Sequence, residues 1–221
     1  MNFIMSWFCK LCVKPIVDAL LIKEVKGLEN IPKKENFILM ANHQSHMDEM
    51  VAGYVCVPRA FHFIGQVDSY SGLTKVLLYF LYFIAGVIHL NRKSEESKKK
   101  SLEESINYLK KGHCLIIYPE GTRTRTGEIG EGRWGTAKLY LRTGVPILPV
   151  GIKGTHELMP PKSGKIKIRR SVYLNIGQPL VFEKELAEAE KIECGTEEYK
   201  QICRRITEKV MAEIKNLVAN N

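Results

Sequence analysis

The sequence lacks three features that would place it in a large class at once: an unbroken apolar run long enough to cross a membrane, a compact set of cysteines, and a linker-like stretch. A transmembrane helix needs about 20 mainly apolar residues. The six cysteines are scattered, Cys9 and Cys12 have no second Cys/His pair, and no secretory signal is visible, so we expect reduced thiols and no metal site. The 221 residues, 45% of them hydrophobic, predict one domain with a substantial core.

Acidic residues are scarce between residues 121 and 170, where eleven Lys or Arg residues face three Glu, so that this region carries eight net positive charges. Such a surface attracts an anionic partner. Aromatic residues are scarce there too: Trp134 and Tyr140 form no stacking platform, and no helix-turn-helix or zinc-finger spacing is visible. We therefore expect no nucleic-acid partner, and an anionic lipid surface or a phosphorylated substrate instead.

Two segments are apolar but unable to span a bilayer. Residues 3–22 mix large apolar side chains with three charged residues and are interrupted by Pro15, which favours a helix lying in the membrane interface. An amphipathic helix that caps the soluble core predicts the same apolar stripe. Residues 76–88 contain thirteen consecutive residues without a charge. A helix over 73–83 there is either a wall for a fatty chain or a plain core helix.

Short apolar runs alternate with helical patterns along the rest of the chain. Buried strands are predicted at residues 37–41, 61–64, 114–118 and 146–150. Helices are predicted from Ser94, the N-cap, to Lys111, and over 197–218. The fold class is therefore α/β, a single domain with a mostly buried central β-sheet flanked by helices. Residues 1–24 form an N-terminal amphipathic membrane-associating segment, and residues 25–221 form the domain proper.

The first motif with catalytic character follows the strand 37–41 and runs from Asn42 to Asp48. If a helix begins at Ser45, His43 stays in the loop and Asp48 lies in the first turn, where its carboxylate reaches one imidazole nitrogen. A general base needs this arrangement, because the carboxylate fixes the tautomer and stabilises the imidazolium. Two alternatives stay open: Ser45 and Asp48 form a capping box only, or His46 is the base.

A second motif, Tyr118-Pro-Glu-Gly-Thr-Arg123, also ends an apolar strand, where α/β sheets bind ligands. Gly121 permits close backbone approach, Thr122 offers a hydroxyl, and Arg123 presents donors that match phosphate oxygens. No Walker lysine is present, so the motif is not a nucleotide P-loop. Its alternative is a turn with a surface arginine. Two weaker motifs are 86–92, which ends at Arg92, and 145–150, a strand between prolines.

These four motifs, in this order and spacing, resemble the motifs of the glycerolipid acyltransferase family. NHQSHMD resembles the family's NHxxxxD (HX4D) block, GVIHLNR its block ending in arginine, YPEGTR its FPEGTR block, and VPILPV its proline-containing block. The resemblance covers nearly the whole chain and implies an acyltransferase domain over 25–221, with its motif-bearing core at 37–155. Tyr118 stands where Phe is usual, and Thr124 where Ser is common.

The resemblance implies a role for each matching residue. His43 would be the general base and Asp48 its partner, with Arg92 as a phosphate ligand. The remaining ligands of the glycerol-phosphate would be Glu120, Gly121, Thr122 and Arg123. No metal and no cofactor are expected, because a thioester already carries a good leaving group and base catalysis completes the transfer.

The implied reaction moves a fatty acyl group from acyl-CoA or acyl-acyl-carrier protein to the free hydroxyl of 1-acylglycerol-3-phosphate. The product is phosphatidic acid, an intermediate of phospholipid biosynthesis. Glycerol-3-phosphate or another lysophospholipid is the alternative acceptor, and a noncatalytic peripheral membrane-binding protein is the alternative from another class. We expect the chain on the cytoplasmic side of a membrane, as a peripheral or monotopic protein.

Overall fold

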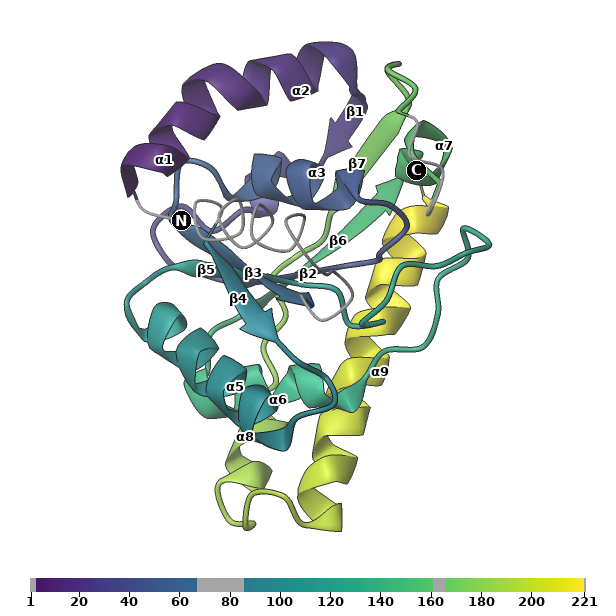
Figure 1. The fold of residues 1–221 in the computed structure, drawn as a ribbon. Helices are drawn as coiled ribbons and strands as arrows, with labels where there is room; N and C mark the ends of the chain where they lie inside the picture. Colours follow the sequence, from purple (N-terminus) through teal and green to yellow (C-terminus); the bar gives the residue numbers. More distant parts are fainter. Residues whose placement is uncertain (1–2, 67–85, 161–165, 221) are drawn as a thin grey trace.

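A computed structural model of the chain describes residues 3–66, 86–160 and 166–220. The strands in these ranges form one seven-stranded sheet in the order β1-β7-β6-β2-β5-β3-β4 (Figure 1). All neighbouring strands are parallel except β6 and β7. The strands are β1 (Ile22–Lys26), β2 (Ile38–Ala41), β3 (Phe61–Gln66), β4 (Val87–Leu90), β5 (Cys114–Ile117), β6 (Ile147–Lys153) and β7 (Val172–Ile176). The predicted α/β class with a central sheet is confirmed.

The central strands have the sequence of strands that are covered on both faces. Every residue of β2 and β5 is buried, and β6 is buried up to its last residue, Lys153. Parallel strands between two helical layers read as continuous apolar runs, because neither face meets water. This explains why the sequence alone located the strands near 37–41, 61–64, 114–118 and 146–150.

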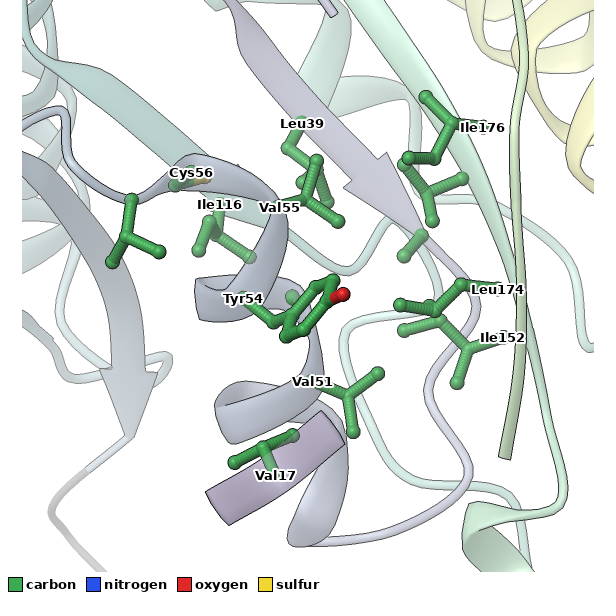
Figure 2. Packing of buried hydrophobic residues seen from close by; sticks show 14 of the residues in the cluster. Val17, Leu39, Val51, Tyr54, Val55, Cys56, Ile116, Ile152, Leu174 and Ile176 are labelled. Atoms are coloured by element: carbon green, nitrogen blue, oxygen red, sulfur yellow. The ribbon is translucent and has the colours of Figure 1, made fainter. Parts of the chain in front are cut away.

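One face of the sheet is covered by the helices of the N-terminal part of the chain (Figure 1). These helices are α1 (Phe3–Phe8), the π-helix η1 (Cys9–Val13), α2 (Lys14–Leu20) and α3 (Met47–Cys56). The short α7 (Thr155–Leu158), from later in the chain, packs on the same face. Figure 2 shows Val51 and Tyr54 of α3 packing between Val17 of α2 and the strands. The sheet contributes side chains such as Leu39 and Ile152 to this cluster.

The opposite face is covered by the later helices, with the long α9 crossing it (Figure 1). These elements are α5 (Glu95–Lys110), the 3-10 helix η3 (Trp134–Thr136), α6 (Ala137–Thr143), α8 (Glu183–Ala189) and α9 (Glu197–Ala219). A further 3-10 helix, η2 (Leu28–Asn30), follows β1. The predicted cap of α5 is present, since the Ser94 hydroxyl accepts a hydrogen bond from the Ser97 N–H at 3.2 Å.

The N-terminal helices turn one apolar face inward and another outward. The inner row recurs at every fourth residue: Met5, Cys9, Val13, Val17 and Leu21. In a regular α-helix such a row rotates by about 40° at each step, and the wider π turn at η1 offsets part of that drift. Five large apolar side chains remain exposed on the outside: Trp7, Phe8, Leu11, Ile16 and Leu20. The inner row agrees with the core-capping interpretation, while the membrane-interface interpretation of residues 3–22 stays a prediction.

Other expectations have different outcomes. The ammonium of Lys14 packs against α3: it lies 4.0 Å from the ring centroid of Tyr54 and donates to the Tyr54 carbonyl at 3.3 Å. The proposed wall at 73–83 lies outside the described residues. The boundary between residues 24 and 25 falls within β1 and stays a prediction. In the described parts of the chain, no helix has both the length and the hydropathy to cross a bilayer.

Candidate active site

The candidate site lies just beyond the carboxyl ends of β2 and β5. The first residue after β2, the fully buried Asn42, binds β6 through its side chain. Its amide nitrogen donates to the Ile152 carbonyl, and its amide oxygen accepts from the Ile152 N–H, both at 2.8 Å. The side chain of Asn42 thereby continues the hydrogen bonding between β2 and β6 beyond the end of β2. This fixes the point at which the chain leaves the sheet, and so the position of the next residue, His43.

His43 and Asp48 are in direct contact. The Nδ1 atom of His43 lies 2.9 Å from Oδ2 of Asp48, whose side chain is completely buried. Oδ2 also accepts the backbone N–H of Gln44 at 2.6 Å and of Ser45 at 2.7 Å. A carboxylate only accepts hydrogen bonds, so Nδ1 carries the proton. Nε2 is then the nitrogen that takes a proton from a bound group.

The local fold creates this contact. Helix α3 begins at Met47, which leaves His43 in the loop and puts Asp48 in the first turn. Negative charge is favourable at this end of a helix, because unpaired N–H groups and the helix dipole both point toward it. The N-cap of α3 is His46 and not Ser45, but the Asp48 carboxylate still accepts the Ser45 N–H, as the acidic residue of a capping box accepts an N–H just before the helix. The capping interpretation and the catalytic interpretation therefore describe the same carboxylate.

The imidazole of His43 is also fixed from the side of β5. The ring of Tyr118 stacks on it, with centroids 3.9 Å apart and planes 11° from parallel. The His43 N–H donates to Oε1 of Glu120 at 2.7 Å, and its carbonyl accepts from the Thr124 N–H at 3.0 Å. The sequence showed Tyr118 as a substitute for Phe but did not predict the stack. A flat aromatic residue directly before Pro-Glu was the available signal.

Glu120 links the loop that contains His43 to a later part of its own loop, which follows β5. Its side chain is only 6% exposed, and its second oxygen, Oε2, accepts the Gly130 N–H at 2.9 Å. Burial raises the pKa of this carboxyl, while the hydrogen bonds from Gly130 and His43 oppose the rise. A β-carbon on Gly130 would lie 3.3 Å from Oε2, so a side chain there would crowd the carboxylate. Glu120 thus holds His43 in place, and its predicted contact with a glycerol-phosphate stays a prediction.

The two predicted phosphate-binding arginines lie at the same edge of the sheet. Arg92, two residues beyond β4, donates through Nη2 to the carbonyl of Gly121. Gly121 has φ +69°, and a β-carbon there would lie 2.8 Å from Nε of Arg133. Arg123 contacts the imidazole of His46. The motif that ends at Arg92 and the motif 118–123 therefore meet at Gly121, which lies 29 positions after Arg92 in the sequence.

Two further titratable groups border the site. His46, the rival base, is exposed on the N-terminal side of α3, and its pKa is lowered by partial burial and by the charge of Arg123. Its contact is with Arg123, whereas Asp48 contacts His43. Glu49 was not singled out by the sequence. Burial and the neighbouring Asp48 raise its pKa to about 7.

The remaining predicted residues have simpler surroundings. Thr122 is exposed in the loop that follows β5. The proline-bracketed motif at 145–150 forms most of β6 and packs in the core, as its plain interpretation predicted. Within the described ranges, no cluster of three or more His, Cys, Asp or Glu residues is arranged to hold a metal ion.

These observations define the class of protein: an α/β domain with a histidine–aspartate pair at the carboxyl end of a central strand. Comparison with known families matches residues 23–153 to the family model named Acyltransferase. Since this is more than half of the chain, the protein belongs to the acyltransferase family. The resemblance recognised from the four motifs is thereby confirmed.

Individual relatives agree. The chain is 34% identical over 167 residues to 1-acyl-sn-glycerol-3-phosphate acyltransferase of Borreliella burgdorferi, covering 76% of this chain and 64% of the relative. It is 29% identical to the chloroplastic LPAT1 enzyme of that name from Arabidopsis thaliana, covering 81% of this chain and 48% of the relative. The chain thus spans about half to two thirds of the length of these relatives.

A solved structure shares the fold. The crystal structure of the 1-acyl-sn-glycerophosphate (LPA) acyltransferase PlsC from Thermotoga maritima aligns with a TM-score of 0.59 at 29% identity. The alignment covers 88% of this chain and 73% of that one. The sheet with its two helical layers is therefore shared between the two proteins.

Proposed function

We propose that the protein transfers a fatty acyl group from an acyl thioester to the free hydroxyl of 1-acylglycerol-3-phosphate, forming phosphatidic acid. The observation that carries this proposal is the 2.9 Å contact between His43 Nδ1 and the buried Asp48 carboxylate. It orients the ring, fixes its tautomer and stabilises positive charge on it. The names of the relatives supply the acceptor and the acyl chemistry.

In the proposed reaction, Nε2 of His43 takes the proton of the acceptor hydroxyl while that oxygen attacks the thioester carbonyl. The tetrahedral intermediate collapses, the carbon–sulfur bond breaks, and the leaving thiolate takes up the proton from the imidazolium. General-base catalysis contributes about 10²–10⁴-fold, and correct positioning of the two substrates contributes more. Tyr118 serves this step by stacking on the imidazole, and Glu120 by binding the backbone N–H of His43.

The acceptor phosphate is assigned to the surface around Gly121. Arg92 and Arg123 reach this surface from different strands, and Thr122 is exposed between them. Guanidinium groups bind phosphate oxygens through paired N–H donors. Gly121 has no side chain of its own, so guanidinium groups approach its backbone closely: Arg92 binds its carbonyl and the Arg133 side chain packs against it. Binding a phosphate here would place the glycerol hydroxyl at the edge where His43 lies.

The substrates are lipids, so the proposal includes a site of action at a membrane. The exposed apolar residues of α1 to α2 would lie in the interface, as amphipathic helices do. The protein would act on the cytoplasmic side as a peripheral or monotopic protein. The donor would be acyl-CoA or acyl-acyl-carrier protein, both of which present the same thioester.

The test is release of free thiol from acyl-CoA by the purified protein, with each acceptor added separately. We expect thiol release that depends on 1-acylglycerol-3-phosphate, together with formation of phosphatidic acid. Faster release with glycerol-3-phosphate or with another lysophospholipid would reassign the acceptor. No acceptor-dependent release with either thioester donor would contradict the proposed reaction and favour the noncatalytic alternative.

A further inference from the structure

A short exposed segment precedes β7, at the sheet edge that also carries the candidate active site. Its sequence, Ile-Lys-Ile-Arg-Arg from Ile166 to Arg170, alternates aliphatic side chains with cations, and all five residues are exposed. Ile166 is 54% exposed and Ile168 is 66% exposed. Single exposed aliphatic residues are common on protein surfaces. Two of them interleaved with three cations form a pattern that matches an anionic lipid surface.

Hydrogen bonds fix this segment beside the N-terminal helices. The Ser171 N–H donates to the Leu21 carbonyl at 3.1 Å, and Nε of Arg170 donates to the Ile22 carbonyl at 2.8 Å. Leu21 directly follows α2, whose exposed Ile16 and Leu20 belong to the outer apolar row. The end of the segment therefore lies beside the residues that follow α2.

The segment is also linked to the catalytic loop. The Lys167 N–H donates to the Leu158 carbonyl at 2.8 Å, and the next carbonyl, that of Met159, accepts from the Ser45 hydroxyl at 2.8 Å. Ser45 in turn donates its N–H to Asp48. A membrane that touches Ile166 and Ile168 would consequently lie at a fixed height relative to His43.

A hollow of about 320 Å³ adjoins the segment. Its lining residues are Lys23, Glu157, Arg169, Arg170, Ser171 and Tyr173. Three cations against one carboxylate leave it positively charged. Nη2 of Arg169 lies 3.0 Å from Oε2 of Glu157, but both side chains are about 60% exposed, so the pair is weak and easily exchanged for another anion. The ammonium of Lys23 lies 5.2 Å from the ring centroid of Tyr173.

We propose that Ile166–Arg170, together with Lys23, is a second membrane contact that binds anionic phospholipid. The isoleucines enter the interface, while Lys23, Arg169 and Arg170 surround a headgroup phosphate in the hollow. The inference rests on the proposed function only in naming a membrane as the place of action. Charge complementarity selects a bilayer over a protein partner, because two isoleucines expose too little apolar area for a stable protein interface.

Vesicle sedimentation of the full chain tests this surface. Arg169→Gln with Arg170→Gln should weaken binding to vesicles of phosphatidylcholine and phosphatidylglycerol roughly twentyfold, and high salt should abolish the difference. Ile166→Ser with Ile168→Ser should weaken binding about tenfold whether or not phosphatidylglycerol is present. Matched controls lie elsewhere: Lys99→Gln with Lys100→Gln on α5, and Val181→Ser beyond β7.

The two proposals fail in different ways. Turnover of a soluble short-chain acceptor should stay unchanged in both double variants, which also shows that they fold. Arg169→Gln alone, which leaves the Arg170 contact with Ile22 intact, should still lower binding severalfold. If both double variants sediment with anionic vesicles as the unaltered protein does, this second contact is wrong, even if acyl transfer is observed. If acyl transfer is absent but the binding differences persist, the contact stands and the proposed reaction falls.

Discussion

Two regions of this molecule depart from the usual distribution of side chains, in opposite directions. At the carboxyl ends of β2 and β5, polar side chains such as Asn42, Asp48 and Glu120 are buried. Along α1 to α2, large apolar side chains such as Leu11 and Ile16 are exposed. Buried polar groups and clustered exposed apolar groups are the two departures that carry information about function.

The two departures have different physical consequences. A buried carboxylate persists only if hydrogen bonds replace its lost hydration, so Asp48 and Glu120 are tied to backbone N–H groups and hold His43 rigidly. An exposed apolar row needs no internal partner, but its contact with water is unfavourable in free energy until another surface covers it. The first region is therefore suited to chemistry, and the second to contact with another apolar surface, which the proposed function takes to be a membrane.

The largest effect should come from the buried polar region. His43→Ala should lower kcat by about 10²–10⁴-fold on both bilayer and soluble acceptors, because the base is lost while the binding surfaces remain. Steady-state turnover of both acceptors measures this. His46→Ala is the matched control and should keep most of kcat, since His46 contacts Arg123 rather than Asp48. If His46→Ala instead lowered kcat strongly and His43→Ala did not, His46 would be the base.

The second-largest effect should come from the arginines that are proposed to bind the acceptor phosphate. Arg92→Lys or Arg123→Lys keeps the charge but loses the planar pair of donors, so the KM for the acceptor should rise by an amount corresponding to about 1–3 kcal/mol. Arg125→Lys, on an exposed neighbour in the same loop, should change KM little. For a monoacylglycerol acceptor, which lacks the phosphate, the KM should be the same in the arginine variants and in the unaltered protein. An unchanged KM in both variants would place the phosphate elsewhere.

The exposed apolar region should affect location and leave the chemistry unchanged. Leu11→Ser with Ile16→Ser should reduce vesicle binding about tenfold and leave turnover of a soluble acceptor unchanged. Deleting residues 1–22 is a poorer test, because it also removes Val17 and Leu21 from the core. Leu28→Ser on η2 is the exposed control. Undiminished vesicle binding would leave these helices with a core-capping role alone.

The smallest effect on activity should come from a buried polar group at the opposite sheet edge. His62, at the start of β3, binds the Gly86 carbonyl through Nδ1 at 2.8 Å and lies 3.0 Å from His113 through Nε2. Burial lowers the pKa of His62 from its ordinary 6.5 to about 4. Between these values the unfolded chain binds more protons than the folded one, so stability is lost as pH falls through this window.

Between pH 7 and pH 4.5 the free energy of unfolding should fall by at most about 3 kcal/mol. Urea denaturation at the two pH values measures this difference. His62→Gln should remove most of this pH dependence and leave kcat at pH 7 unchanged. If His62→Gln lowered kcat without lowering the free energy of unfolding, His62 would also serve the reaction. The distinction between the two regions would then need revision.

The sequence alone determined the elements whose signals are local. The apolar runs near 37–41 and 114–118 became β2 and β5, and Ser94 capped α5 as expected. The contact of His43 with Asp48 was predictable for the same reason: five residues separate them, and the start of α3 decides whether they meet. Capping and strand burial depend on neighbouring residues, so they can be inferred from short windows of sequence.

Tertiary structure decided everything that joins distant parts of the chain. Glu120 holds the His43 backbone across 77 residues, and Tyr118 supplies the face on which the imidazole stacks. The antiparallel pairing of β7 with β6, and the division of the N-terminal helices into inner and outer faces, had no local signal. These features depend on which surfaces pack together when the whole sheet forms. A pattern of residue types shows that a face is apolar, but packing decides whether it meets the core or remains exposed.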